Sequence, residues 1–128
     1  MTTMTKEKPR AEVLDPHQTI NSGPALQRWR RQIKISRPVY AKLSDCSART
    51  LATVEGKNRL SLKKLRKISE TLSLLTALCE IMEPQNVSSW LQQPNEWFDG
   101  CTPMQAVDEG KIDKVWELIY HTREGGYL

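Results

Sequence analysis

The residue types that carry out covalent or metal chemistry are scattered along this 128-residue chain. The three cysteines and two histidines are far apart and form no C-x-x-C or comparable spacing: Cys46, Cys79, Cys101, His17 and His121. Zinc ligands and reactive cysteine pairs are normally grouped more closely than this. We therefore expect reduced, buried or half-buried thiols in preference to a metal or redox site, and no cofactor.

Catalytic side chains cannot be picked out either. The sequence shows no Ser/His/Asp order, no glycine-rich phosphate loop and no pair of carboxylates at a spacing typical of a pocket. We expect a binding protein and not an enzyme.

Charge is the chemistry that the chain does concentrate. Residues 1–72 contain 16 Lys and Arg against 6 Asp and Glu, whereas residues 73–128 contain 3 against 9. Long-range electrostatic fields select which surfaces meet first, so the two parts should have different partners. The first part is suited to a polyanion and the second is not.

No segment is suited to a membrane. The longest stretches without a charged residue, 16–27 and 84–95, have 12 residues each and fall short of the roughly 18 to 20 apolar residues that a membrane span needs. Charges throughout residues 1–23 leave no apolar core for a secretory signal. We expect a cytoplasmic protein with no membrane partner.

Hydrophobic spacing predicts helices and no strand. Residues 1–23 have no sustained apolar period and end in the helix-breaking pair Gly23 and Pro24, so a flexible arm is expected there. Helices are then predicted over 25–33, 36–43, 47–56, 61–72 and 74–82, and shorter ones around 87–91, 104–107 and 112–119. The fold class is all-α, and the charge split favours two small cores, with domains at 24–83 and 84–128.

Residues 26–72 resemble the helix-turn-helix domain of the Xre and lambda-repressor-like family. The segments that carry the resemblance are ISRPVYAKL (35–43), DCSARTLATVEGK (45–57) and LSLKKLRKISETL (60–72). By this register, Ala41 lies where two short helices cross, and Glu55 pairs with Arg30 of the first helix. The family usually has glycine where Asp45 stands, but Asp tolerates a left-handed conformation better than most residues.

In that family the amino-terminal part of the third helix enters the major groove of operator DNA. The matching outward positions here are Ala48, Arg49 and Thr53, of which Arg49 could hydrogen-bond O6 and N7 of guanine. Phosphate contacts are expected from Arg37, Ser47, Lys57 and Lys63. The basic residues Lys64, Arg66 and Lys67 fit a phosphate-binding face and a merely solvated helix face equally well.

A second resemblance covers the acidic part. WLQQPNEWFDGCTPMQAV (90–107) and EGKIDKVWELIYHTREGGYL (109–128) are similar to the toxin-binding domain of the Xre/MbcA/ParS antitoxins. The match rests on aromatic, apolar, proline and glycine residues at fixed offsets: Trp90, Leu91, Pro94, Asn95, Phe98, Gly100, Pro103, Gly110 and Val115, with Gly126 and Tyr127 near the end. Trp90, Pro94, Asn95, Gly100 and Pro103 are expected to have structural roles. Pro94 and Asn95 should stop one helix, and Pro103 suits the first turn of the next, with Thr102 as its cap. Most of the large apolar residues, Trp116 included, are expected in the core, whereas Trp97 fits an interface as well as a core.

This second resemblance implies an antitoxin that neutralises a RES-domain toxin, an enzyme that consumes NAD or transfers ADP-ribose from it. In the family the carboxyl-terminal end of the antitoxin lies at the mouth of the toxin's NAD pocket, which corresponds here to Arg123, Glu124, Gly125, Gly126, Tyr127 and Leu128. The resemblance implies an autorepressor that binds its operator as a homodimer and forms a hetero-oligomer with its toxin. Two alternatives stay open: a stand-alone phage-type repressor, and an inhibitor that keeps the helix-turn-helix only as a scaffold.

Overall fold

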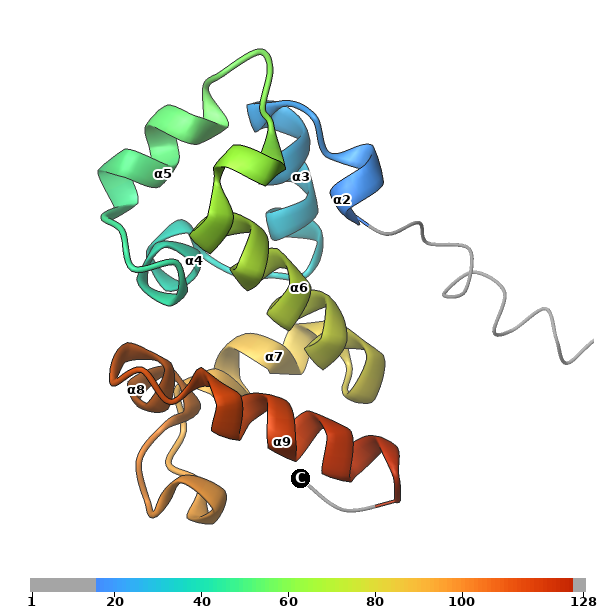
Figure 1. Ribbon diagram of the computed structural model, residues 1–128, viewed down its shortest axis with the longest axis vertical. Coiled ribbons are helices and arrows are strands. Elements are labelled where there is room, and N and C mark those ends of the chain that lie inside the picture. The colour runs from blue at the N-terminus through green and yellow to red at the C-terminus, as the bar shows by residue number, and fades with distance from the viewer. Residues whose placement is uncertain (1–15, 126–128) are drawn as a thin grey trace, which may run out of the picture.

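The computed structural model describes residues 16–125, and every regular element in that part of the chain is helical. The all-α class predicted from the sequence is therefore confirmed. The elements, shown in Figure 1, are α2 (Pro16–Thr19), α3 (Gly23–Gln32), α4 (Arg37–Leu43), α5 (Ala48–Glu55), the 3₁₀ turn η1 (Leu62–Lys64), α6 (Arg66–Ile81), α7 (Pro84–Leu91), the 3₁₀ turn η2 (Glu96–Phe98), α8 (Pro103–Asp108) and α9 (Ile112–Arg123). Among these helices, none has the length and apolar character required to cross a bilayer.

Short polar side chains start several helices where the sequence predicts them. The hydroxyl of Ser36 accepts the Val39 amide at 3.3 Å, and that of Thr102 accepts the Gln105 amide at 3.0 Å. The Gln105 side chain returns a bond from the Thr102 amide at 2.7 Å, which completes a capping box. Each cap satisfies amides that have no partner inside the helix.

Among the described residues with a positive φ, one lies in the turn between α4 and α5 and another in the loop after η2. Asp45, between α4 and α5, has a φ of 58°, and Gly100, after η2, has a φ of 87°. Asp is among the few side chains that adopt this conformation readily, which explains why the turn closes without glycine.

The start of the folded region differs from the prediction. Ser22 caps α3 by accepting the Ala25 amide at 3.2 Å, so Gly23 and Pro24 form the first turn of that helix instead of breaking the chain before it. Residues 16–19 form α2, and Ile20 is buried, so the last part of the predicted arm belongs to the folded protein. The rest of that arm, residues 1–15, lies outside the described residues.

The fourth and fifth predicted helices are one. After η1, α6 runs without interruption through Ser73, because neither Gly nor Pro occurs between residues 66 and 81 to break its backbone hydrogen bonds. Its amino end is Arg66 and not Ser61, since Ser61 makes no side-chain cap.

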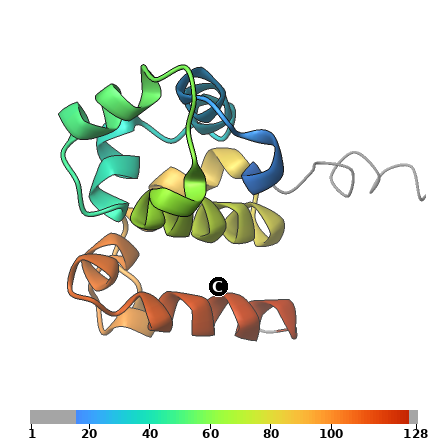
Figure 2. The same ribbon diagram turned by 45° about the horizontal axis from the view of Figure 1, so that its top comes forward.

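Helix α6 lies in the middle of the fold (Figure 2). It packs against α2 and α4 of the basic part and against α7 and α9 of the acidic part, while α8 packs on α4. The buried apolar side chains form one continuous cluster that runs from Ile20 to Ile119. The two separate cores that the charge split suggested are therefore not present: apolar residues such as Leu72, Leu75 and Leu78 of α6 are shared by both parts.

A close approach of backbone atoms at Gly23 predicts that a larger residue is not tolerated there. A Cβ built on Gly23 would lie 2.3 Å from the Glu55 carbonyl oxygen, and the Gly23 amide donates to the Lys57 carbonyl at 2.8 Å. We expect Gly23→Ala to lower the free energy of unfolding by about 3 kcal/mol, because backbone must move to admit the methyl group. Urea unfolding monitored by circular dichroism measures this.

The matched control is Gly56→Ala, at a position where the added Cβ meets no atom closer than 3.6 Å and φ is −90°. We expect that variant to be neutral or stabilised by about 0.5 kcal/mol. Equal effects at the two glycines would contradict the packing argument.

Candidate functional site

A buried ion pair fixes the direction of α5. The Arg30 guanidinium of α3 donates from Nε to Glu55 Oε2 at 2.7 Å and from Nη2 to Glu55 Oε1 at 3.0 Å. The predicted ion pair is therefore present, and it is bidentate. Its Nη1 donates to the Ile35 carbonyl at 3.0 Å. Both side chains are almost fully buried, and their hydrogen bonds compensate the charges that burial removes from water.

Arg37 extends the buried ion pair. Its Nε and Nη2 both lie 3.0 Å from Glu55 Oε1, which places a second guanidinium on the same carboxylate. A carboxylate has enough lone pairs to accept both arginines. The Arg37 side chain is still 35% exposed, and its expected phosphate contact stays a prediction.

Burial and hydrogen bonding oppose each other at Glu55. Burial raises the pKa of Glu55, but hydrogen bonds and charges from Arg30 and Arg37 outweigh it, so the net pKa lies below the ordinary value. The carboxylate is therefore ionised at neutral pH and stabilises the arrangement of α3, α4 and α5.

The outer face of α5 carries the predicted reading positions. Leu51 and Val54 point into the core, and Ala48, Arg49 and Thr53 are exposed. No carboxylate among the described residues pairs with Arg49, whereas the Thr53 hydroxyl donates back to the Arg49 carbonyl at 3.2 Å. Arg49 is thus the side chain on this face with its hydrogen-bond donors free for a ligand.

The other predicted phosphate contacts are placed differently from one another. Lys57, just beyond α5, and Lys63, in η1, are exposed. The Ser47 hydroxyl accepts the Thr50 amide and hydrogen-bonds Thr50 Oγ1, each at 3.0 Å. Ser47 therefore caps α5, and its expected phosphate contact stays a prediction.

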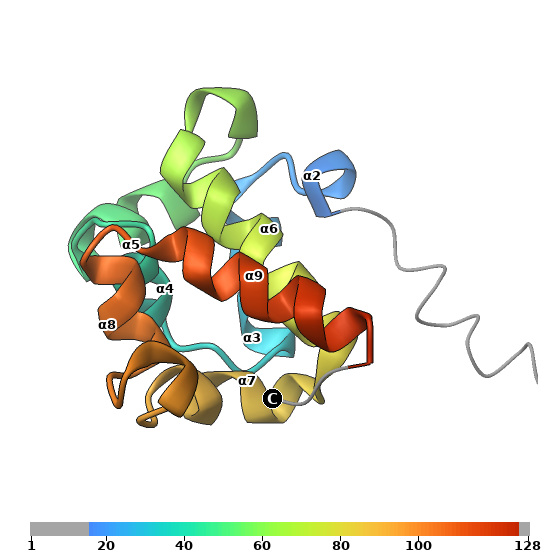
Figure 3. The ribbon, with the colours of Figure 1, turned by 60° about the horizontal axis from the view of Figure 1, so that its bottom comes forward.

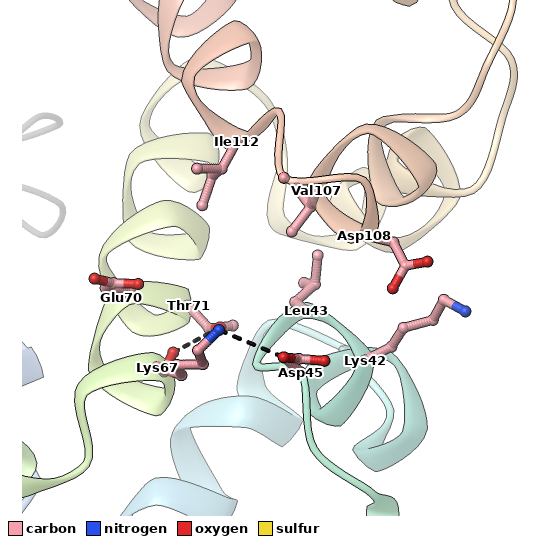
Figure 4. Close-up of a pocket in the computed structure, with 10 residues that line it drawn as sticks. Lys42, Leu43, Asp45, Lys67, Glu70, Thr71, Val107, Asp108 and Ile112 are labelled. Carbon is pink, nitrogen blue, oxygen red and sulfur yellow. Dashed lines mark hydrogen bonds and ion pairs between the residues drawn. The ribbon is translucent and has the colours of Figure 1, made fainter.

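Two basic residues of α6 pair with exposed carboxylates, as residues on a solvated helix face commonly do. Arg66 pairs with Glu70 at 3.1 Å and Lys67 with Asp45 at 3.4 Å, all four being exposed. Figure 4 shows the Lys67–Asp45 contact at a pocket of about 300 Å³ between the α4–α5 turn, α6 and the α8–α9 connection. Its lining mixes both signs of charge, with Lys42 and Asp108 among the residues concerned.

In the acidic part, a loop closed on Asn95 positions the aromatic residues. The Asn95 side-chain oxygen Oδ1 accepts the backbone amide of Trp97 at 2.9 Å. The backbone amide of Asn95 donates to the Cys101 carbonyl, and that of Gly100 donates to the Asn95 carbonyl, both at 3.0 Å. Pro94 follows the end of α7, and Pro103 lies in the first turn of α8. Trp90 is half-buried and meets Phe98 edge to face, with ring centroids 6.4 Å apart.

Trp97 lies at the surface against α9. Its ring stacks on His121 with centroids 5.5 Å apart, and its indole N–H donates to the Lys114 carbonyl at 3.1 Å. The side chain is therefore oriented by α9 while 37% of the residue remains exposed.

The predicted tail is described only in part. Arg123, at the end of α9, donates to Glu80 at 2.6 Å, Glu124 is the residue that caps the helix, and Gly125 has a φ of 103°. Gly126, Tyr127 and Leu128 lie outside the described residues.

Trp116 and Tyr120 of α9 form a contact that the sequence analysis did not predict. Trp116 is half-buried and packs against the core with part of its surface, and its ring centroid lies 6.0 Å from that of the exposed Tyr120. The signal was available: positions 116 and 120 lie four apart, on the side of the helix away from Val115 and Leu118.

The structure also bears on metal binding: within residues 16–125, no three His, Cys, Asp or Glu side chains are placed to share an ion.

No family model, curated protein or solved structure matches the chain.

The lowered pKa of Glu55 predicts how stability responds to acid. Its ionised form contributes fully above the unfolded pKa of about 4.3, and this contribution is lost as pH falls through the lower folded value. We expect Glu55→Gln to reduce the free energy of unfolding by about 3 kcal/mol at pH 7, because Arg30 is left buried without its counter-charge. The difference in free energy of unfolding between wild type and Glu55→Gln should be smaller at pH 3 than at pH 7, as measured by urea unfolding at both pH values.

Glu70→Gln is the control, because the exposed pair with Arg66 should contribute less than about 1 kcal/mol. A gap at Glu55 that stays constant from pH 7 to pH 3 would mean that its charge is not what stabilises the fold.

Proposed function

We propose that this chain is a DNA-binding antitoxin, which represses its own operator and neutralises a RES-domain, NAD-consuming toxin. One observation carries the DNA-binding part: Arg49 stands exposed, without a carboxylate partner, in the first turn of a short helix whose direction is set by a buried ion pair. A guanidinium with free donors at the start of a firmly placed helix is suited to base recognition in the major groove.

The arrangement around α5 supports a helix-turn-helix. Helices α4 and α5 pack on each other across the left-handed turn at Asp45, and the small residue Ala41 is buried there. The Cys46 amide closes the turn on the Ala41 carbonyl at 3.0 Å. In this proposal α5 enters the major groove and α4 lies across the backbone of the duplex.

Lys57 and Lys63 are phosphate contacts in this proposal, because both are exposed and follow α5 along the chain. Such contacts fix register without reading sequence. Two copies of the chain would present two α5 helices to a palindromic operator, which is the reason for proposing a homodimer on DNA.

The antitoxin part draws on the acidic half. Its loop from Pro94 to Pro103 is held by backbone hydrogen bonds and a capping box, so the elements that carry the resemblance form one ordered unit. That unit supports α9, which leads into the carboxyl-terminal residues that we propose occlude the NAD pocket.

The recognition proposal makes Arg49 the specificity residue. Arg49→Ala should lose about 1 to 3 kcal/mol of operator binding and relax discrimination at one base pair. Lys63→Ala should instead weaken operator and non-operator DNA alike and reduce the salt slope by about 1. Fluorescence anisotropy on the chain's own promoter and on single-base variants, at several salt concentrations, separates the two.

Lys111→Ala serves as the charge-matched control, since Lys111 pairs with Glu109 in the acidic half. If Arg49→Ala and Lys111→Ala bind the promoter and its variants equally well, the assignment of α5 as reader is wrong.

The antitoxin proposal predicts rescue by a specific partner. A RES-domain protein encoded beside this chain should deplete cellular NAD when expressed alone, and co-expression should restore NAD and give a complex that co-purifies. Deletion of residues 125–128 should weaken the rescue, because the occluding segment is removed.

The two alternatives give different results in the same assays. Promoter binding without any effect on the RES-domain protein would favour a stand-alone repressor, and NAD rescue without promoter binding would favour an inhibitor that uses the helix-turn-helix as a scaffold.

A further inference from the structure

Both exposed aromatic residues of the described chain lie at α9. Among residues 16–125, the large apolar side chains that are exposed are Trp97 and Tyr120, at 37% and 54%. Trp97 is bonded to α9 through the Lys114 carbonyl, and Tyr120 is part of α9 and contacts Trp116. Apolar side chains that adjoin one another on the surface of a small protein, as Trp116 and Tyr120 do, mark an interaction surface more often than isolated ones do.

Helical spacing turns four residues of α9 to the same side. Asp113, Trp116, Glu117 and Tyr120 follow the i, i+3, i+4, i+7 pattern, while Val115, Leu118 and Ile119 are buried. These four residues line an open depression of about 450 Å³, and we call them the α9 face. Figure 3 shows α9 on the outside of the molecule, and Figure 1 shows it at the opposite end of the long axis from α5.

The aromatic side chains of the α9 face are held in place. The Arg123 guanidinium lies 5.9 Å from the centre of the Tyr120 ring and is itself bonded to Glu80 of α6 at 2.6 Å. The Tyr120 ring in turn lies against Trp116. Side chains restrained before binding lose less conformational entropy in a complex, and Trp and Tyr are among the residue types that contribute most at protein interfaces.

Charge selects the partner of this face. Asp113 and Glu117 are exposed among the aromatics, on a half of the chain with 3 basic and 9 acidic residues. Nucleic acids and anionic lipid surfaces would be repelled. A second copy related by a twofold axis would set the same carboxylates against each other, because such an interface pairs like patches. A protein surface with cations around an apolar centre is the complementary occupant.

We propose that the α9 face docks a basic patch of the toxin, with Trp116 and Tyr120 as apolar anchors and Asp113 and Glu117 as partners for its cations. This assignment rests on the proposed antitoxin function. It adds a docking surface separate from the carboxyl-terminal residues that enter the NAD pocket, and it leaves α5 at the far end free for DNA.

The test is the affinity of the full-length chain for the purified RES-domain protein encoded beside it, measured by titration calorimetry. Tyr120→Ala should weaken binding about 30-fold, which corresponds to an interface anchor. Tyr120→Phe should bind within about threefold of wild type, since the aromatic ring is what packs. The double variant Asp113→Lys, Glu117→Lys should weaken binding by at least about tenfold at low salt, because reversing the attraction slows association.

Glu70→Lys is the charge-change control, because Glu70 lies at the start of α6 beside the basic part. All variants should keep the melting temperature of wild type within a few degrees, since the changed side chains are exposed.

Toxin binding at wild-type affinity by both Tyr120→Ala and the double Lys variant would overturn the docking surface and leave the antitoxin function standing. Failure of the wild-type chain to bind the RES-domain protein would overturn both. Sedimentation at matched concentrations covers the remaining case: dissociation of a wild-type dimer by Tyr120→Ala would assign the α9 face to self-association and overturn the proposal.

Discussion

The basic end of the molecule depends on one buried carboxylate. Glu55 receives Arg30 from α3 and Arg37 from the first turn of α4, and Arg30 also holds the Ile35 carbonyl between those helices. A buried ion pair adds little stability over well-packed apolar residues, but breaking it is costly, so its usual effect is to exclude other arrangements. Here the Arg30–Glu55 pair fixes the position of the carboxyl end of α5. The Gly23 amide donates to the Lys57 carbonyl, which holds the residues just after that end. These contacts set the direction of α5, and Arg49 lies in the first turn of the same helix.

The division of charge along the chain is not a division of the fold. Charge describes what lies on the surface, whereas the number of cores depends on which apolar faces find each other. Helix α6 has buried residues toward both parts, and the Ser44 hydroxyl also bonds the Thr71 hydroxyl across α4 and α6 at 2.8 Å. A helix that is apolar on more than one side must be covered on more than one side. One body with two differently charged ends results.

Local features of the structure could be read from the sequence, and distant contacts could not. Ser36 and Thr102 as caps, and Asp45 as a left-handed residue, depend on neighbours a few positions away, so the residue type alone nearly decides them. The role of Gly23 depends on a carbonyl in α5, and that of Arg37 on a carboxylate that the sequence had already assigned to Arg30. The resemblance predicted the Arg30–Glu55 pair because it carries three-dimensional information that periodicity lacks. It gave no prediction for the partial exposure of Trp116, which depends on how α9 packs on α6.

The shared core also sets how the charged groups are distributed over so small a protein. Helix α6 has 16 residues and so extends about 24 Å, with Lys63 just before its amino end and Glu80, the partner of Arg123, near its carboxyl end. At physiological salt the Debye length is about 8 Å, so exposed charges at the two ends of this helix are largely screened from each other. The charges are not fully separated, because Lys42 and Lys67 line the same pocket as Asp108 and Ile112, where the basic part meets α8 and the start of α9. The single core brings these elements into contact, an arrangement that the charge pattern of the sequence by itself could not provide.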